Sequence, residues 1–270
     1  AFAIDGTSRS GLEAALIGLI EPGDKVLIPA YGRFAYLLGE ICERAKAQVT
    51  YLEKDWDSVF DQDAIIAEIK RVNPKIVALV HGETANGQMK PLEKIGKLCQ
   101  ETDVFFVVDT GGTYGGAPVK VDEWGIDIAI AGTQKCVSVP SGLSLITYND
   151  RVEKVLTARY QKELGLSKDF RNDRHISSNY LDLSQLQRYW NKERINHHTE
   201  ATSMIYALHE GLRMMIQEGI ENGYERHSQN DRAIQAGIEA MGLAIFGDRT
   251  TKMPTVTPIL IPEGVDGEAV

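Results

Sequence analysis

Two short apolar segments, each followed by an ionisable residue, most constrain the fold of this chain of 270 residues. The segment 104–108 leads into Asp109, and the segment 127–131 leads through Gly132 to Lys135. Uninterrupted apolar runs of this length are typical of buried strands in a parallel sheet. Ligands bind such sheets outside the carboxyl ends of the strands. The sequence therefore predicts an α/β fold whose site contains Asp109 and Lys135.

The same pattern continues along the first half of the chain. Further apolar runs typical of strands lie at 1–4, 25–29, 48–52, 75–80 and 143–148. Helical spacing of apolar residues lies between them, at 11–20, 34–45, 61–71 and 91–101. Strands that alternate with helices predict βαβ units, and therefore a mostly parallel sheet sandwiched by helices.

The second half of the chain is mainly helical in pattern. Long helices are expected at 201–220 and 222–241. The charged segment 161–175 has little apolar pattern, and we expect a mobile loop there. Residues 255–261 predict a last strand.

Both ends of the sequence indicate a piece of a longer protein. Residues 1–4 begin as though inside a strand, and residues 263–270 stop where a new element would start. We expect residues 1–218 to form a large domain that lacks its N-terminal part. Residues 219–270 are expected to begin a smaller C-terminal α/β domain.

The composition is that of a globular protein with a substantial core, 43% hydrophobic and 25% charged. The net charge of −9 argues against nucleic acid or an anionic membrane as the main partner. No apolar run approaches the roughly 20 residues that span a bilayer, and no signal-peptide pattern is visible. Cys42, Cys99 and Cys136 lack CxxC spacing, so neither a disulfide framework nor a zinc site is predicted. The cytoplasm is the expected location.

A lysine beside a carboxylate has a specific use in the chemistry of pyridoxal phosphate (PLP). The amine forms a Schiff base with the aldehyde of PLP, and the acid pairs with the pyridinium nitrogen. An ordinary ion pair at the strand ends is the alternative, and Lys135 and Asp109 alone favour it.

Other candidate residues follow other strands of the same predicted sheet. Residues 6–10 lie between a strand and a helix, where backbone N–H groups and side-chain hydroxyls make an anion site. An ordinary helix cap is the alternative. Tyr31 follows one strand and is able to stack on a planar ligand, although simple packing is more common. Thr84 follows another strand and offers a hydroxyl at the same edge of the sheet.

The histidines offer weaker signals. His81 is a candidate base, but a histidine in a turn is more often a hydrogen-bonding residue. His197 and His198 are adjacent, and adjacent histidines rarely ligate the same metal. No Asp or Glu at ligand spacing completes a set, so no metal site is predicted.

The order of these features is specific, although each feature alone is weak. An anion turn, an aromatic ring, a hydroxyl, an aspartate and a lysine each follow a separate strand. From end to end, the chain resembles the class V, fold-type I PLP-dependent aminotransferases. The stretches that carry the resemblance are Gly6-Thr7-Ser8-Arg9 with Leu12-Glu13-Ala14, Glu21-Pro22-Gly23-Asp24, His81-Gly82-Glu83-Thr84, Val108-Asp109, Gly132-Thr133-Gln134-Lys135 and His197-His198-Thr199.

Within this class the chain is similar to the alanine–glyoxylate and serine–pyruvate aminotransferases. It is more similar to the bacterial (S)-ureidoglycine–glyoxylate aminotransferases of purine catabolism. The stretches shared with that group are Tyr31-Gly32-Arg33-Phe34, Gly132-Thr133-Gln134-Lys135-Cys136, Ser138-Val139-Pro140-Ser141-Gly142 and Asn196-His197-His198-Thr199-Glu200-Ala201-Thr202.

The resemblance implies PLP as the cofactor and assigns roles to single residues. Lys135 is the Schiff-base lysine, Asp109 is the pyridinium partner and Tyr31 stacks on the ring. Thr84 forms a hydrogen bond to the cofactor near its ring oxygen. Thr199 reaches the phosphate of the neighbouring subunit, so the active unit is a homodimer. The residues placed around the phosphate of the same subunit are Thr7, Ser8, Arg9 and Gln134.

The resemblance also implies a reaction. Asn196 stands where the alanine–glyoxylate enzymes have a tyrosine, and it would reach the neighbouring active site. An amide there hydrogen-bonds a ureido group in both directions. The implied reaction is transamination from (S)-ureidoglycine to glyoxylate, giving oxalurate and glycine in purine and allantoin catabolism.

Two alternatives to this reaction stay open, and a third is disfavoured. The first is an alanine–glyoxylate or serine–glyoxylate/pyruvate aminotransferase. The second, more distant one is a cofactor-free, non-catalytic relative. A cysteine desulfurase is disfavoured, because its chemistry needs a cysteine on a mobile loop and the segment 161–175 has none.

The sequence departs from the family pattern beside Asp109. The family usually has an aliphatic residue two positions after the aspartate, packed on the ring face opposite the aromatic. Gly111 stands there, so we expect weaker holding of the ring or another side chain in the gap. The arginine that binds the substrate carboxylate in the family would lie beyond residue 270, and the N-terminal substrate contacts before residue 1.

Overall fold

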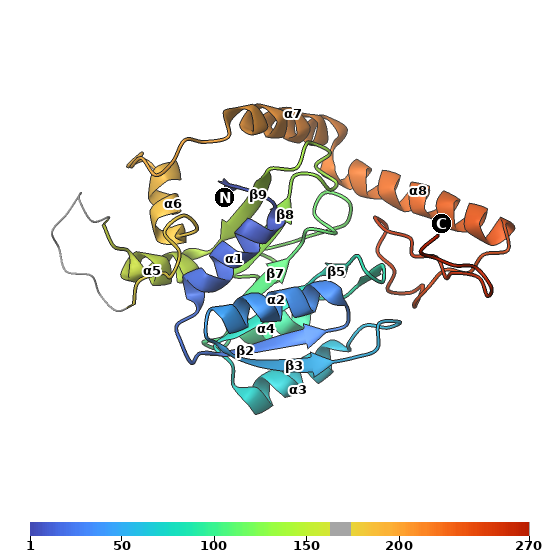
Figure 1. Ribbon diagram of the computed structural model, residues 1–270, viewed down its shortest axis with the longest axis horizontal. Helices are drawn as coiled ribbons and strands as arrows, with labels where there is room; N and C mark the ends of the chain where they lie inside the picture. Colours follow the sequence, from blue (N-terminus) through green and yellow to red (C-terminus); the bar gives the residue numbers. More distant parts are fainter. Residues whose placement is uncertain (163–173, 270) are drawn as a thin grey trace.

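The computed structural model describes residues 1–162 and 174–269, and its main feature is a seven-stranded sheet (Figure 1). The strand order is β1-β9-β8-β7-β4-β2-β3. β9 pairs antiparallel with β1 and β8, and the other neighbours pair in parallel. The strands are β1 Phe2–Asp5, β2 Lys25–Ala30, β3 Gln48–Glu53, β4 Ile76–Val80, β7 Phe105–Asp109, β8 Ile128–Gly132 and β9 Leu143–Tyr148. The predicted, mostly parallel sheet is confirmed.

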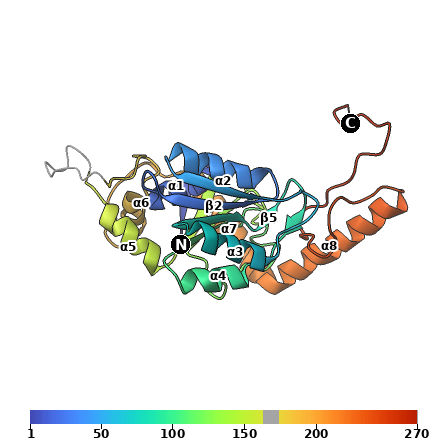
Figure 2. The same cartoon turned by 90° about the horizontal axis from the view of Figure 1, so that it is seen from below.

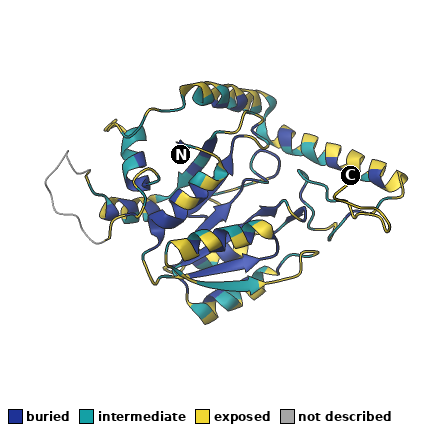
Figure 3. Cartoon of the chain, in the orientation of Figure 1, coloured by how far each residue is buried: buried dark blue, intermediate teal, exposed yellow. Residues whose placement is uncertain are grey.

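Helices cover both faces of the sheet because both faces of its central strands are apolar. On β2, Val26 and Ile28 belong to one buried cluster, and Leu27 between them belongs to another. Successive side chains of a strand point to opposite faces of the sheet, so helices must pack on each face to bury its apolar side chains. Figure 2 shows α1 and α2 on one face and α3 and α4 on the other, and Figure 3 shows that the central strands of the sheet are buried. These helices are α1 Ser8–Leu19, α2 Arg33–Arg44, α3 Gln62–Val72 and α4 Glu93–Gln100.

The later helices are α5 Asp150–Arg159, α6 Leu183–Trp190, α7 Thr202–Glu218 and α8 Ile220–Ala240. The last two are the expected long helices, so that prediction is confirmed (Figure 1). The mobile loop expected at 161–175 falls mostly on residues 163–173, outside the described residues. None of the described helices is long and apolar enough to cross a membrane.

The prediction of a strand at 255–261 is wrong. This segment forms one isolated bridge, between Ile259 and Ile245. Pro258, in the middle of it, has no N–H to donate to a ladder. The described residues after α8 also contain no strand for it to join. The division of the chain at residue 219 stays a prediction.

A short hairpin that the sequence did not predict follows β4. Its strands are β5 Gly82–Glu83 and β6 Gln88–Met89, which pair antiparallel. Just before it, the His81 N–H donates to the Asp109 carbonyl at 2.9 Å and extends the pairing of β4 with β7. The hairpin therefore starts at the carboxyl edge of the main sheet, beside Asp109.

Close packing of α4 gives a test of this fold. A Cβ atom on Gly96 would lie 1.6 Å from the backbone oxygen of Trp124, whereas one on Gly237 in α8 would meet nothing within 4 Å. Gly96→Ala should lower the free energy of unfolding by about 2 kcal/mol or more. Gly237→Ala, the matched control, should raise it by about 0.5–1 kcal/mol, because glycine weakens a helix interior. Urea denaturation measures both, and an unchanged midpoint for Gly96→Ala would contradict the packing of α4 on Trp124.

Candidate functional site

A cavity of about 250 Å³ lies at the carboxyl edge of the sheet. Strand pairing fixes this edge: Val80, the last residue of β4, lies opposite Asp109, the last residue of β7, and Asp109 lies opposite Ile130 of β8. The predicted site residues that line the cavity are Thr7, Ser8, Arg9, Thr84, Asp109, Gln134 and Lys135. The fold thus brings together side chains that are far apart in the sequence.

One wall of the cavity is the N-terminus of α1. Gly6, with a φ of 111°, turns the chain from β1 into the helix. The Thr7 hydroxyl caps the helix and accepts the Arg9 N–H at 3.4 Å. No acidic residue lies in the first turn, so the partial positive charge of the helix start is left for a ligand. With the Ser8 hydroxyl and the Arg9 guanidinium beside it, this wall is able to hold an anion.

Asp109 brings a buried carboxylate to the cavity, 7% exposed. Its Oδ1 accepts the backbone N–H of Gly111 at 2.8 Å. Burial raises the pKa of Asp109 to about 6; the Gly111 N–H opposes this rise, Glu83 adds to it and Lys135 opposes it. Asp109 therefore titrates closer to neutral pH than an ordinary aspartate does. Gly111 lines the same cavity and contributes no side chain to it.

Lys135 lies in the turn that follows β8. The Ser138 N–H donates to the Lys135 carbonyl at 2.9 Å, which closes the turn. The side chain of Lys135 is exposed and lines the cavity beside Gln134. An amine and a buried carboxylate therefore share one cavity, as the order of motifs in the sequence predicts.

The aromatic ring that lines this cavity is Phe34, and not Tyr31. Tyr31 is fully buried in the core cluster that contains the apolar faces of α3 and α4. Its hydroxyl donates to the Val80 carbonyl at 3.0 Å, with the His81 carbonyl at 3.3 Å. Lys90 Nζ lies 3.6 Å from the centroid of its ring. The prediction that Tyr31 stacks on a ligand is therefore wrong, because these core contacts take up its ring.

Glu83, which the sequence analysis did not single out, holds Phe34 in place. Gly32 gives α2 no side-chain cap, and the Glu83 carboxylate takes over that role. Its Oε2 accepts the Phe34 N–H at 2.9 Å, and its Oε1 accepts the Ala85 N–H at 3.0 Å. Glu83 is fully buried, and this burial raises its pKa. The available signal was an acidic residue inside His81-Gly82-Glu83-Thr84, directly after a predicted strand.

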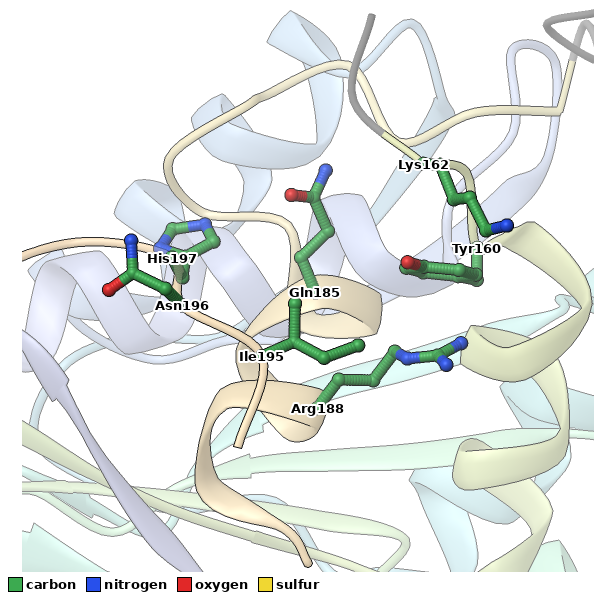
Figure 4. Close-up of a pocket in the computed structure, with 7 residues that line it drawn as sticks. All are labelled: Tyr160, Lys162, Gln185, Arg188, Ile195, Asn196 and His197. Atoms are coloured by element: carbon green, nitrogen blue, oxygen red, sulfur yellow. The ribbon is translucent and has the colours of Figure 1, made fainter. Parts of the chain in front are cut away.

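Asn196 and Thr199 lie away from the Lys135 cavity. Both are exposed, in the segment between α6 and α7. Asn196 lines a separate cavity of about 230 Å³, where it lies with His197 across from Arg188 and Tyr160 (Figure 4). The Arg188 guanidinium there packs on the Tyr160 ring, 4.1 Å from its centroid. Neither Asn196 nor Thr199 lines the Lys135 cavity of its own chain.

The segment before α7 also brings a histidine to two carboxylates. His198 Nε2 lies 3.6 Å from Asp5 Oδ2 and 3.3 Å from Glu200 Oε2. The expectation that no acidic residue completes a set with the histidines is therefore wrong. Asp5 belongs to β1, far from His198 in the sequence, so spacing along the chain gave no sign of this carboxylate.

His81 is a buried hydrogen-bonding residue and not a base in the cavity. Its Nδ1 lies 2.8 Å from the Thr113 hydroxyl, and its ring meets the Trp124 ring edge-on. It is 2% exposed and is not among the residues that line the Lys135 cavity. Burial, together with the nearby Lys90, lowers the pKa of His81 to about 3.

This burial predicts a dependence of stability on pH. In the unfolded chain a histidine titrates near 6.5, so between that pH and about 3 the unfolded chain binds more protons than the folded one. The contribution of His81 to stability is therefore lost as the pH falls, by up to about 1.4 kcal/mol per pH unit. His81→Asn keeps a polar partner for Thr113 but removes the titrating group. The free energy of unfolding of this variant should therefore fall less steeply as the pH is lowered. Urea denaturation at several values between neutral and acidic pH compares the two proteins; equal slopes would contradict a buried neutral histidine.

The comparisons with known proteins all point to the same family. The class V aminotransferase family matches residues 3–270. The (S)-ureidoglycine–glyoxylate transaminase of Bacillus subtilis is 56% identical over 100% of this chain and 66% of its own length. The alanine–glyoxylate aminotransferase of Callithrix jacchus is 32% identical over 97% of this chain and 61% of its own length. The chain thus spans about two thirds of the length of these curated relatives or somewhat less.

Solved structures agree with this result. The ureidoglycine–glyoxylate aminotransferase from Bacillus subtilis superposes with a TM-score of 0.93 over 99% of this chain and 66% of that one. The alanine–glyoxylate aminotransferase from Nostoc sp. superposes with a TM-score of 0.92 at 35% identity, over 99% of this chain and 68% of that one. The fold-type I architecture and the family expected from the sequence are confirmed, and the chain belongs to the class V aminotransferases, which in general depend on PLP.

Proposed function

We propose that the protein is a PLP-dependent aminotransferase that transfers the amino group of (S)-ureidoglycine to glyoxylate, giving oxalurate and glycine in purine catabolism. The observation that carries the proposal is the cavity in which Lys135, Asp109 and the N-terminus of α1 meet. The 56% identity with the (S)-ureidoglycine–glyoxylate transaminase of Bacillus subtilis supports this donor. Alanine–glyoxylate transamination is the second candidate, supported by a relative at 32% identity.

The start of α1 fits the phosphate of PLP by its charge. A phosphate suits a helix N-terminus that carries no acidic side chain in its first turn. The guanidinium of Arg9 adds a full positive charge beside it. The side chains that would hold the phosphate are Thr7, Ser8, Arg9 and Gln134.

The other side of the cavity fits the ring of PLP. The Asp109 carboxylate would pair with the ring nitrogen, and the Thr84 hydroxyl would bond the ring oxygen. The Lys135 amine would bond to the aldehyde carbon. Phe34 would pack on one face of the ring, while Gly111 leaves another part of the wall without a side chain.

Two residues would then carry the proton chemistry. Bound PLP supplies a ring that accepts electrons as the α-proton of the donor leaves. Asp109 would hold a proton on the ring nitrogen, an interaction that burial strengthens. Lys135 Nζ would take the α-proton as a general base and return it as a general acid.

We further propose a homodimer in which Asn196 and Thr199 of each chain serve the cavity of the other. Both residues are exposed and lie away from the Lys135 cavity of their own chain. The amide of Asn196 offers a donor and an acceptor that match a ureido group, and Thr199 would add a hydroxyl for the phosphate.

The three cysteines are free thiols, which fits a role in the cytoplasm.

Donor preference tests this function. The full-length protein loaded with PLP should lose the visible absorbance of the aldehyde form faster with (S)-ureidoglycine than with alanine or serine. Asn196→Ala should slow the ureidoglycine reaction on the order of 10- to 100-fold, because a buried hydrogen-bonding group of the donor loses its partner. Lys135→Ala should abolish the reaction with every donor. Rapid-mixing spectroscopy measures these rates.

Other results of this experiment would select the alternatives. Faster conversion by alanine or serine would move the protein to the second candidate. No visible absorbance at all, even with PLP in excess, would instead indicate a cofactor-free relative.

Phe34 and Tyr31 provide a test of the ring-packing residue. Phe34→Ala should weaken PLP binding on the order of 10-fold, because aromatic packing contributes about 1 kcal/mol beyond the buried area. Tyr31→Phe removes a buried hydroxyl and should lower the free energy of unfolding by about 1 kcal/mol, with PLP affinity unchanged. Titration of both variants with PLP, followed by absorbance, compares them. If Tyr31→Phe weakened PLP binding and Phe34→Ala did not, Tyr31 rather than Phe34 would be the residue that stacks on the ring.

A further inference from the structure

Asp5, His198 and Glu200 form a cluster of possible metal ligands outside the Lys135 cavity. Asp5 is the last residue of β1, and the other two lie in the segment before α7. One ligand atom from each residue lies within 4.8 Å of the others. These side chains are 18%, 10% and 11% exposed, respectively, so water covers little of the cluster.

Several buried polar atoms of this cluster lack a hydrogen-bond partner. Among the described residues, His198 Nε2, Asp5 Oδ1 and both Glu200 oxygens have no hydrogen-bond partner. No lysine or arginine of the described segments forms an ion pair with either carboxylate. Two nearly buried carboxylates beside an imidazole nitrogen are costly unless a proton or a cation lies among them.

A second layer of contacts fixes the orientation of the His198 ring. Its Nδ1 lies 2.8 Å from His197 Nδ1, so Nε2 is the nitrogen left to face the carboxylates. The rings of Tyr189 and Tyr180 pack against His198 with centroids 5.0 Å and 5.5 Å away. The Tyr180 hydroxyl also donates to Asp5 Oδ2 at 3.2 Å. Support of this kind is what orients histidine and carboxylate ligands in metal sites.

The two distances from the His198 ring to the carboxylates match the spacing of ligands around a small divalent cation. Bonds of roughly 2.0–2.2 Å in a tetrahedron separate neighbouring ligand atoms by roughly 3.3–3.6 Å. The separations from His198 Nε2 are 3.3 Å to Glu200 Oε2 and 3.6 Å to Asp5 Oδ2. One imidazole and two carboxylates suit Zn²⁺ and its first-row neighbours.

We propose that Asp5, His198 and Glu200 bind one divalent transition-metal ion of the Zn²⁺ type, with a coordination position left open. The ion would tie the end of β1 to the segment that carries Asn196 and Thr199. Gly6, which starts the anion-binding turn, directly follows Asp5. This site does not depend on which amino donor the protein uses.

The test measures metal binding by the full-length protein without an affinity tag. After dialysis against a chelator, calorimetric titration with Zn²⁺ should give one site per chain. Glu200→Gln and Asp5→Asn keep the shape of each side chain and should weaken binding at least about 10-fold. Glu101→Gln, which changes an exposed carboxylate at the end of α4, is the matched control and should bind as the unchanged protein does.

Thermal unfolding gives a second readout. Zn²⁺ should raise the unfolding temperature of the unchanged protein and of the control, but not that of Glu200→Gln or Asp5→Asn. Circular dichroism confirms that each variant is folded before titration. No binding at millimolar Zn²⁺, or binding that neither substitution weakens, would overturn the proposal.

Discussion

Parallel pairing of β4, β7 and β8 is the constraint on which the rest of the structure depends. On β7, Phe106 and Val108 belong to one buried cluster, while Val107 between them belongs to the other. A slip of one residue in the strand pairing would turn each side chain to the opposite face of the sheet. Neither cluster would then pack against the helices that cover it. The position of Asp109 is therefore set by core packing rather than by contacts within the cavity. The same pairing sets where β8 ends and, with it, where the turn to Lys135 begins.

Much of the fold and most of the cavity could be predicted from the sequence, because they depend on local patterns and one general rule. Apolar runs located the strands, and parallel strands share a carboxyl edge. The direction of single side chains is a different matter. Tyr31 directly follows β2 and turns into the core, whereas Phe34 lies on the first turn of α2 and lines the cavity. Sequence spacing cannot distinguish two aromatics three residues apart when tertiary packing decides which one reaches a ligand.

Two further differences between prediction and structure have long-range causes. The segment 255–261 has the composition of a strand, but β propensity produces a strand only where a neighbouring strand pairs with it. The cluster of Asp5, His198 and Glu200 joins residues that are far apart in the sequence through the position of β1 in the sheet. Ligand-spacing rules compare residues that are close in sequence, and they miss sets that the topology assembles.

The contact between Glu83 and α2 has a consequence for binding. Glu83 belongs to the hairpin of β5 and β6, yet it accepts a hydrogen bond from the first turn of the helix that carries Phe34. A ligand that packs on Phe34 is therefore coupled to the order of this hairpin. Coupling of this kind is reciprocal, so the factor by which an ordered hairpin strengthens binding equals the factor by which binding favours the ordered hairpin. A substitution in residues 85–89 that disordered the hairpin would thus weaken the binding of a ligand packed on Phe34, although these residues do not line the cavity.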